Sequence, residues 1–115
     1  MQQSALSPES FCDVRPDRER VVVRVGGEFD LAVAPHVAAT VHELLDAGFT
    51  RIVIDLRELS FLDSAGVHTL VSARRSAGRR GVALSLLRGP TNVHRVLELT
   101  ATDSLFDFDR AGVGG

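Results

Sequence analysis

The chain has 115 residues, with an apolar fraction of 44% and a charged fraction of 24%, the composition of one globular domain. Its formal net charge of −2 gives no electrostatic footprint for direct nucleic-acid binding, and the single cysteine, Cys12, excludes an internal disulfide. The sequence has neither an apolar run of about 18 residues nor a basic-then-apolar leader, so we expect no membrane span, no secretory signal and a cytoplasmic location.

The N-terminal part of the sequence predicts a pair of antiparallel strands. Residues 1–10 mix polar residues and proline without an apolar period, so we expect a flexible terminus. Residues 11–15 and 20–25 are the strand candidates, because β-branched residues dominate the second run and Pro16-Asp17 supplies turn chemistry between them. Gly26-Gly27 is predicted to end the second strand.

The remaining sequence alternates between helix and strand patterns. The expected elements are a helix from Pro35 to Gly48, a strand at 51–56, a helix from Ser64 to Ala77 that Gly78 ends, a strand at 82–86, a helix opened by residues 89–92 and an edge strand at 105–108. This alternation implies parallel strands joined by right-handed crossovers. We therefore predict an α/β fold over residues 11–109, with a mixed, mostly parallel sheet of four to five strands, about three helices packed on it and a flexible tail at 110–115.

Asp63 and Ser64 lie where the strand at 51–56 leads into the second helix. A small hydroxyl residue is a favourable N-cap, so we predict that Ser64 caps this helix with an accessible hydroxyl. The alternative is that Ser64 does nothing beyond starting the helix. Because the carboxyl ends of parallel strands gather at one edge of a sheet, the acidic loop Glu28-Phe29-Asp30 is expected beside this junction. The two segments together form a candidate site.

Catalytic and metal-binding patterns are weak in this sequence. The histidines are scattered over three predicted helices without the spacing of metal ligands, and we interpret them as exposed helix residues: His36, His42, His68 and His94. A nucleophile elbow requires glycine two residues before the serine, where this chain has Leu62. We therefore expect no enzyme activity, no cofactor and no metal, and we interpret Cys12 as a small buried apolar residue.

Three stretches of the chain have the order and spacing of a known family. Residues 27–30, Gly-Glu-Phe-Asp, are similar to a Gly-Glu-Leu-Asp loop. Residues 52–66 resemble a strand followed by the phosphorylation motif Asp-Ser-(Ser/Thr/Ala)-Gly, and residues 93–106 resemble the helix and segment near the family's C-terminus. The family that the chain resembles is the STAS domain family, and within it the bacterial anti-sigma factor antagonists.

The resemblance implies a regulatory switch in which Ser64 is the phosphoacceptor. In this family the unphosphorylated antagonist binds an anti-sigma factor that is also a serine-protein kinase, and a sigma factor is released. Phosphorylation ends the binding, and a PP2C-type phosphatase resets it. The implied partner-binding residues are Glu28, Asp30, Asp63, Ser64, Ala65, Gly66 and His68. The alternative is a phosphorylation-independent STAS scaffold within a signalling or lipid-transport assembly.

Two positions depart from the family pattern. Ala65 stands where many relatives carry a second hydroxyl, which leaves Ser64 as the acceptor in the motif. We also expect a shortened C-terminal helix, because residues 110–115 cannot form the final amphipathic helix of many relatives. The apolar surface that this helix would cover is then exposed, shielded by the N-terminal segment or used for association, which leaves weak homodimerisation open.

Overall fold

A five-stranded sheet in the order β1-β2-β3-β4-β5 is the centre of the fold in the computed structural model, which describes residues 10–18 and 20–109. The strands are β1 (Phe11–Asp17), β2 (Arg20–Phe29), β3 (Arg51–Leu62), β4 (Ala83–Leu87) and β5 (Asp107–Asp109). β1 is antiparallel to β2, and the other neighbouring pairs are parallel. The predicted mixed, mostly parallel sheet is confirmed.

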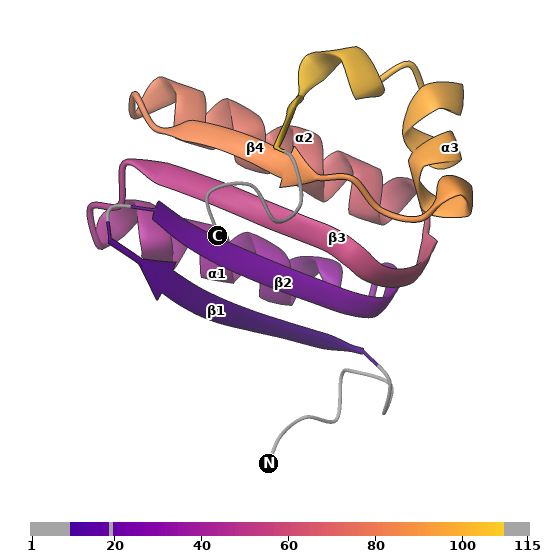
Figure 1. Ribbon diagram of the computed structural model, residues 1–115, viewed down its shortest axis with the longest axis horizontal. Helices are drawn as coiled ribbons and strands as arrows, with labels where there is room; N and C mark the ends of the chain where they lie inside the picture. The colour runs from indigo at the N-terminus through magenta and orange to yellow at the C-terminus, as the bar shows by residue number, and fades with distance from the viewer. Residues whose placement is uncertain (1–9, 19, 110–115) are drawn as a thin grey trace.

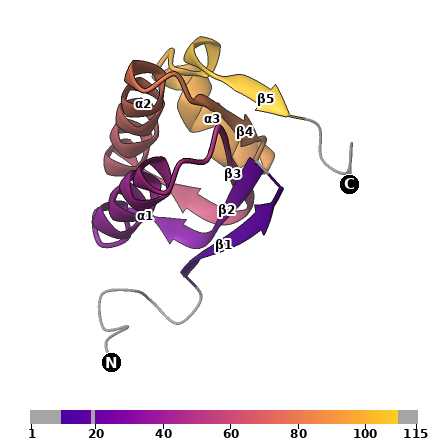
Figure 2. The ribbon, with the colours of Figure 1, turned by 90° about the vertical axis from the view of Figure 1, so that its left-hand side faces the viewer.

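Two helices cover one face of this sheet. Helices α1 (Ala34–Asp46) and α2 (Ser64–Arg79) pack side by side on that face (Figure 2). Helix α3 (Thr91–Leu99) lies at one end of the sheet, and a short 3-10 turn, η1 (Asp103–Leu105), leads from it to β5 (Figure 1). The opposite face of the sheet is not covered by α1 or α2.

The hydrophobic core lies between the sheet and these two helices. Alternate residues of β2 are fully buried in it, and so are Ile52, Ile54 and Leu56 of β3. Helix α1 contributes the face that its sequence period predicts, with Val37 and Val41 at 0% and 1% exposure. Burial of each such side chain contributes roughly 1.5–3 kcal/mol, so the ends of β2 and β3 are held firmly where their loops begin.

Both central strands are longer than the sequence predicts. Gly26-Gly27 does not end the second strand, because β2 continues to Phe29 through register shifts against β3 on either side of these glycines. Gly27 has a φ of +78°, a conformation that glycine adopts freely and that a bulge can absorb. Similarly, β3 continues past Leu56 to Leu62, the partner of Phe29. The two strands therefore end side by side.

Other element boundaries also differ from the predictions. Pro16-Asp17 belongs to β1, and the turn falls at Arg18, with a φ of +63°. Gly78 lies inside α2, which ends at Arg79 before Gly81 turns the chain with a φ of +71°. The predicted edge strand is divided between η1 and β5. The flexible termini predicted at 1–10 and 110–115 lie outside the described residues, except for Ser10, which is buried.

Candidate functional site

The start of α2 presents Ser64 as an exposed residue, and the cap is Asp63. Asp63 has extended backbone geometry, and its Oδ1 accepts a hydrogen bond of 3.0 Å from the Gly66 amide. The prediction that Ser64 is the N-cap was therefore wrong by one residue, since aspartate accepts this bond as well as serine does. Ser64 is the first helical residue, and its hydroxyl has no hydrogen-bond partner within the described part of the chain.

Free backbone amides lie beside the Ser64 hydroxyl. In the first turn of α2, the Gly66 amide bonds to the Asp63 carboxylate and the Val67 amide bonds to the Asp63 carbonyl at 3.0 Å. The amides of Ser64 and Ala65 make no hydrogen bond to any described residue. Unpaired amides and the positive end of the helix dipole favour an anion. A negatively charged group on Ser64 is thus compatible with the helix.

Gly66 is buried where α2 approaches the ends of both central strands. A Cβ atom at this position would lie 2.5 Å from Leu62 Cδ1 and 2.8 Å from the Phe29 carbonyl oxygen. The second contact is with backbone, which cannot rotate away as a side chain can. Glycine is therefore required by close packing, and the Asp-Ser-x-Gly spacing combines a cap, an exposed hydroxyl and a close contact in one turn.

The predicted neighbouring loop does lie beside this turn. Phe29 pairs with Leu62, and the Asp63 amide donates a hydrogen bond of 3.3 Å to the Phe29 carbonyl. Asp30 follows directly, and its Oδ1 accepts hydrogen bonds from the amides of Ala32 and Val33 at 3.0 and 3.3 Å. One oxygen of this carboxylate thus holds the turn into α1.

Glu28 differs from Asp30 in what its side chain contacts. Its backbone amide donates a hydrogen bond of 3.1 Å to Ser10 Oγ, which ties the end of β2 to the start of β1. The Glu28 side chain itself is exposed. Asp30 therefore combines a structural bond with a charge, whereas Glu28 presents only a charge to solvent.

A shallow groove runs between α1 and α2 past Ser64. It encloses about 490 Å³ and is lined by Leu31, Ala34, Pro35, Ala38, Ser64, Ala65, His68 and Thr69. A second recess of about 240 Å³ continues along the same two helices, and His68 and Thr69 line both. The structure thus brings three of the predicted partner-binding residues, Ser64, Ala65 and His68, to one groove.

The sequence interpretation missed an apolar residue on the rim of this groove. Leu31 is 75% exposed in the turn after Asp30. Phe61, two residues before the Asp63 cap, is also exposed but does not line the groove. An exposed large apolar residue on a groove is typical of a protein-binding surface. A leucine next to the acidic loop, outside any helical or strand period, is the signal in the sequence that could have identified Leu31.

One histidine is buried, contrary to the prediction that all four are exposed. His36, His42 and His68 are exposed, but His94 is 6% exposed. Its ring packs edge-to-face against Phe108, with the centroids 5.3 Å apart. Phe108 belongs to β5, so the contact that buries His94 depends on a strand pairing that the helix pattern does not reveal. Cys12 is half-buried, and burial raises the pKa of its thiol despite the hydrogen bond to Thr40.

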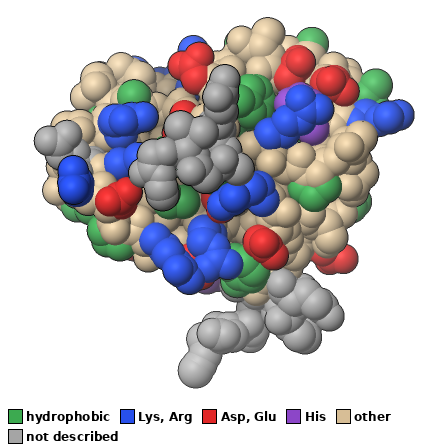
Figure 3. Space-filling view, in the orientation of Figure 1, with side chains coloured by type: hydrophobic (Ala, Val, Ile, Leu, Met, Phe, Trp, Pro, Cys, Tyr) green, Lys and Arg blue, Asp and Glu red, His purple; other side chains and the backbone are tan. Residues whose placement is uncertain are grey.

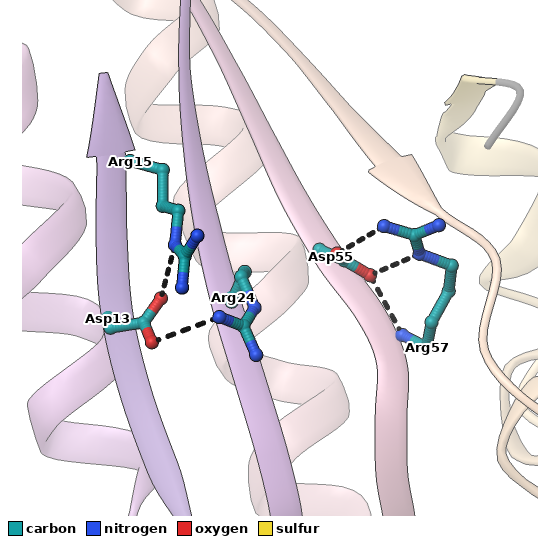
Figure 4. A network of polar contacts seen from close by, with 5 residues as sticks. All are labelled: Asp13, Arg15, Arg24, Asp55 and Arg57. Atoms are coloured by element: carbon teal, nitrogen blue, oxygen red, sulfur yellow. Dashed lines mark hydrogen bonds and ion pairs between the residues drawn. The ribbon is translucent and has the colours of Figure 1, made fainter. Parts of the chain in front are cut away.

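The face of the sheet without α1 and α2 carries charges of both signs (Figure 3). There Arg57 holds Asp55 through Nε and a terminal guanidinium nitrogen, at 3.0 and 2.9 Å, while Arg24 lies near Asp13 at 3.4 Å (Figure 4). Burial alone would raise the pKa of Asp55, but the hydrogen bonds from Arg57 and the charges of Arg57 and Arg24 lower it below its usual value. This network stabilises the face opposite the groove.

A mixed sheet with two helices on one face is a two-layer α/β domain. Its candidate site lies at the carboxyl ends of adjacent strands, where such sheets commonly bind ligands. The chain belongs to the STAS domain family, whose family model matches residues 13–111. The resemblance on which the sequence interpretation rests is confirmed.

Known relatives extend over most of this chain. The anti-sigma-B factor antagonist of Bacillus subtilis is 24% identical over 103 residues, which cover 90% of this chain and 94% of that protein. The anti-sigma-B factor antagonist of Listeria monocytogenes is 30% identical over 93 residues, which cover 79% and 80% of the two chains. These relatives and this chain therefore align over nearly a whole domain.

Solved structures share the fold. A crystal structure of an anti-sigma factor antagonist from Mycobacterium paratuberculosis has a TM-score of 0.78 at 24% identity, over 89% of this chain and 87% of that one. The anti-sigma factor antagonist SpoIIAA in its unphosphorylated form has a TM-score of 0.77 at 23% identity, over 90% and 92%. These two antagonists therefore share the fold of this chain. Among the described helices of this chain, none has the length and apolar character needed to cross a membrane.

Proposed function

We propose that this chain is an anti-sigma factor antagonist that is switched off by phosphorylation of Ser64. The observation that carries the proposal is the placement of an exposed, unpartnered hydroxyl at the first residue of α2, where it lines a groove between two helices. The names of the relatives in Bacillus subtilis and Listeria monocytogenes support the same role. The unphosphorylated chain binds an anti-sigma factor that is also a serine kinase, and a sigma factor is released.

The proposed docking surface combines apolar contact with acidic charge. Leu31 and the small residues of the groove provide a recess for an apolar side chain of the partner. Glu28 and Asp30 at the end of β2 and Asp63 after the end of β3 do not line the groove, but they add negative charge at the same edge of the sheet, which favours a partner surface rich in arginine or lysine. His68 lines the groove one turn after Ser64 and is included in this surface.

Phosphorylation acts on this surface through charge and bulk. A phosphoryl group adds a charge of about −1.5 to −2 at neutral pH. The free amides of Ser64 and Ala65 and the helix dipole tolerate this charge, so the domain stays folded. The partner, however, meets a second anion next to Asp63 and added bulk in the groove, and it dissociates. A PP2C-type phosphatase restores binding.

In this proposal the chain is a substrate and not a catalyst. Within the described residues, no side chain is hydrogen-bonded to the Ser64 hydroxyl in the way that a general base would be. The kinase therefore supplies the base, the nucleotide and the metal ion for the transfer.

The test is to incubate the full chain with ATP and each candidate serine kinase encoded in its genome, and to map the product by mass spectrometry. We expect a single phosphate on Ser64, loss of the product in Ser64→Ala, and normal modification of Ser72→Ala, because Ser72 is an exposed serine two turns further along α2. Absence of modification at Ser64 with every kinase would refute the switch. Continued binding to one of the same kinases would then identify a phosphorylation-independent scaffold.

A further inference from the structure

Three side chains of types that can bind a metal ion lie close together near the C-terminal end of α3. His94 and Glu98 lie one turn apart on α3, and Asp103 lies in η1. One ligand atom from each of them is within 4.8 Å of the other two. The sequence interpretation expects no metal because no pair of histidines has ligand spacing. The fold supplies the third side chain from a different element, across a turn.

The turn between α3 and η1 fixes the position of Asp103. The Ala101 amide bonds to the Glu98 carbonyl at 3.0 Å, and the Thr102 amide bonds to the Leu97 carbonyl at 2.9 Å. This double bonding pattern is a Schellman motif, in which Ala101 adopts a φ of +58°. The chain therefore reverses sharply after α3 (Figure 1) and brings Asp103 back toward the last turn of the helix.

The His94 ring lacks the polar partners that a buried imidazole needs. Its side chain is 7% exposed, and Nδ1 is buried without a hydrogen-bond partner. Nε2 points toward Glu98, but the distance to Oε2 is 3.9 Å, which is too long for a hydrogen bond. A buried polar atom without a partner costs about 1–3 kcal/mol. Nε2 therefore faces the Glu98 carboxylate, and neither ring nitrogen has a hydrogen bond to a described residue.

We propose that His94, Glu98 and Asp103 bind a divalent first-row transition metal ion of the Zn²⁺ class. Ligand atoms on such an ion lie about 2.0–2.2 Å from it, so two ligands of one ion stand a few ångströms apart, as the His94 and Glu98 atoms do. The Glu98 side chain is 54% exposed and can rotate to close the remaining gap. One imidazole with two carboxylates suits zinc better than magnesium or calcium, which prefer oxygen ligands alone.

Bound metal would tie η1 to α3 and leave the Ser64 groove unchanged. Asp103 lies three residues before Phe106, and Phe106 is part of the core. The segment from Asp103 leads into β5, which forms the edge of the sheet next to β4. The ion is therefore a structural ligand that stabilises the C-terminal edge, and it is independent of the proposed phosphorylation.

The test is titration of the full metal-free chain with ZnCl₂ by calorimetry, together with Co²⁺ absorption spectroscopy and thermal unfolding. We expect one equivalent of Zn²⁺ to bind and raise the melting temperature, and Glu98→Gln and Asp103→Asn each to weaken affinity at least tenfold. Glu43→Gln and His42→Gln, at exposed positions of α1, serve as controls and should bind as the wild type does. These variants avoid His94, whose replacement also disturbs its packing on Phe108.

Two outcomes would overturn the proposal. The first is wild-type protein that shows no stoichiometric binding at micromolar Zn²⁺. The second is binding that survives in the Glu98→Gln/Asp103→Asn double variant, and its loss in His42→Gln would place the ion on exposed histidines instead.

Discussion

The amide of Asp63 donates a hydrogen bond of 3.3 Å to the carbonyl oxygen of Phe29, and this bond fastens the cap of α2 to the end of β2. The phosphoacceptor candidate Ser64 and the acidic residue Asp30 each follow one partner of this bond directly. Two loops that are more than 30 residues apart in the sequence are therefore joined directly by a backbone hydrogen bond. A substitution at the junction acts on both loops, whereas a substitution at the rim of the groove acts on binding alone.

Replacement of Ser64 by glutamate should abolish partner binding without unfolding the domain. The free first-turn amides of α2 accept a negative charge, so we expect the free energy of unfolding of Ser64→Glu to change by less than about 0.5 kcal/mol. Affinity for the cognate anti-sigma factor should fall at least tenfold in calorimetry. Ser104→Glu, at an exposed serine of η1 that lines neither recess, is the control and should keep its affinity. A large drop in melting temperature for Ser64→Glu would contradict this account.

Gly66→Ala should destabilise the junction. The added methyl group would meet Leu62 Cδ1 at 2.5 Å and the Phe29 carbonyl at 2.8 Å, and overpacking of this kind costs about 1–3 kcal/mol. Urea unfolding followed by circular dichroism measures the loss. Gly78→Ala is the control, since nothing lies within 4 Å of a Cβ at this exposed helical position. It should be stabilising by about 0.5–1 kcal/mol, because alanine is the better helix former. Equal effects of the two substitutions would exclude the steric argument.

Much of this architecture could be predicted from local patterns. The apolar period of α1, the dense β-branched run of β2 and the buried run of β3 each depend on residues that are close together in the sequence, so their type and approximate position were predicted correctly. The adjacency of the two loops also followed, because parallel strands place their carboxyl ends on one edge. These features needed no knowledge of side-chain packing.

Features that depend on distant residues could not be predicted in this way. Two consecutive glycines, Gly26-Gly27, are typical of the end of a strand, and β2 continues past them because it pairs with β3. The apolar period of α3 does not decide whether His94 is buried or exposed. Phe108, which packs against its ring, lies on β5 and is distant in the sequence. The cap was misassigned between Asp63 and Ser64 because both side chains are good acceptors and only the observed bond to Gly66 distinguishes them.

Acidification should remove the contribution of the Asp55–Arg57 pair to the free energy of unfolding. The folded-state pKa of Asp55 is lowered, so the pair contributes stability above the unfolded value near pH 3.9, and this contribution is lost as the pH falls through the folded-state pKa. Arg57→Gln leaves a buried carboxylate without its main partner. We expect the free energy of unfolding at pH 7 to fall by about 1–3 kcal/mol, less than for a fully buried ion pair because Arg57 is half-exposed. Between pH 5 and pH 3, the variant should lose less additional stability than the wild type does.

Urea unfolding at several pH values measures this difference. Arg51→Gln, at an exposed position of the same strand, is the control and should follow the wild-type profile. Parallel pH profiles for Arg57→Gln and the wild type would show that the pair does not set the acid response.

Two substitutions at Asp30 separate its charge from its structural bond. Asp30→Asn keeps an oxygen that accepts from the amides of Ala32 and Val33, so stability should be nearly unchanged while partner affinity falls with the lost charge. Asp30→Ala removes both, and we expect a further loss of about 1 kcal/mol in the free energy of unfolding. Calorimetry and urea unfolding on both variants give the comparison. Wild-type affinity in Asp30→Asn would remove this charge from the interface.

Leu31→Ala tests the apolar part of the proposed docking surface. Leu31 is 75% exposed, so its truncation removes little buried area and should change the free energy of unfolding by less than about 0.5 kcal/mol. In a complex, the same side chain becomes buried at the rim of the groove that Ser64 lines. Truncation of a buried interface residue of this size costs about 1–2 kcal/mol, or roughly a fivefold to thirtyfold loss of affinity for the anti-sigma factor.

The matched control for Leu31 is Leu99→Ala. Leu99 is 79% exposed, like Leu31, but it ends α3 and does not line the groove. We expect it to bind as the wild type does. If both leucine substitutions weaken binding equally, the interface is not centred on Ser64 but extends to α3. If neither substitution weakens binding, the apolar part of the proposed docking surface is wrong, and the partner is recognised through Ser64 and the acidic loop.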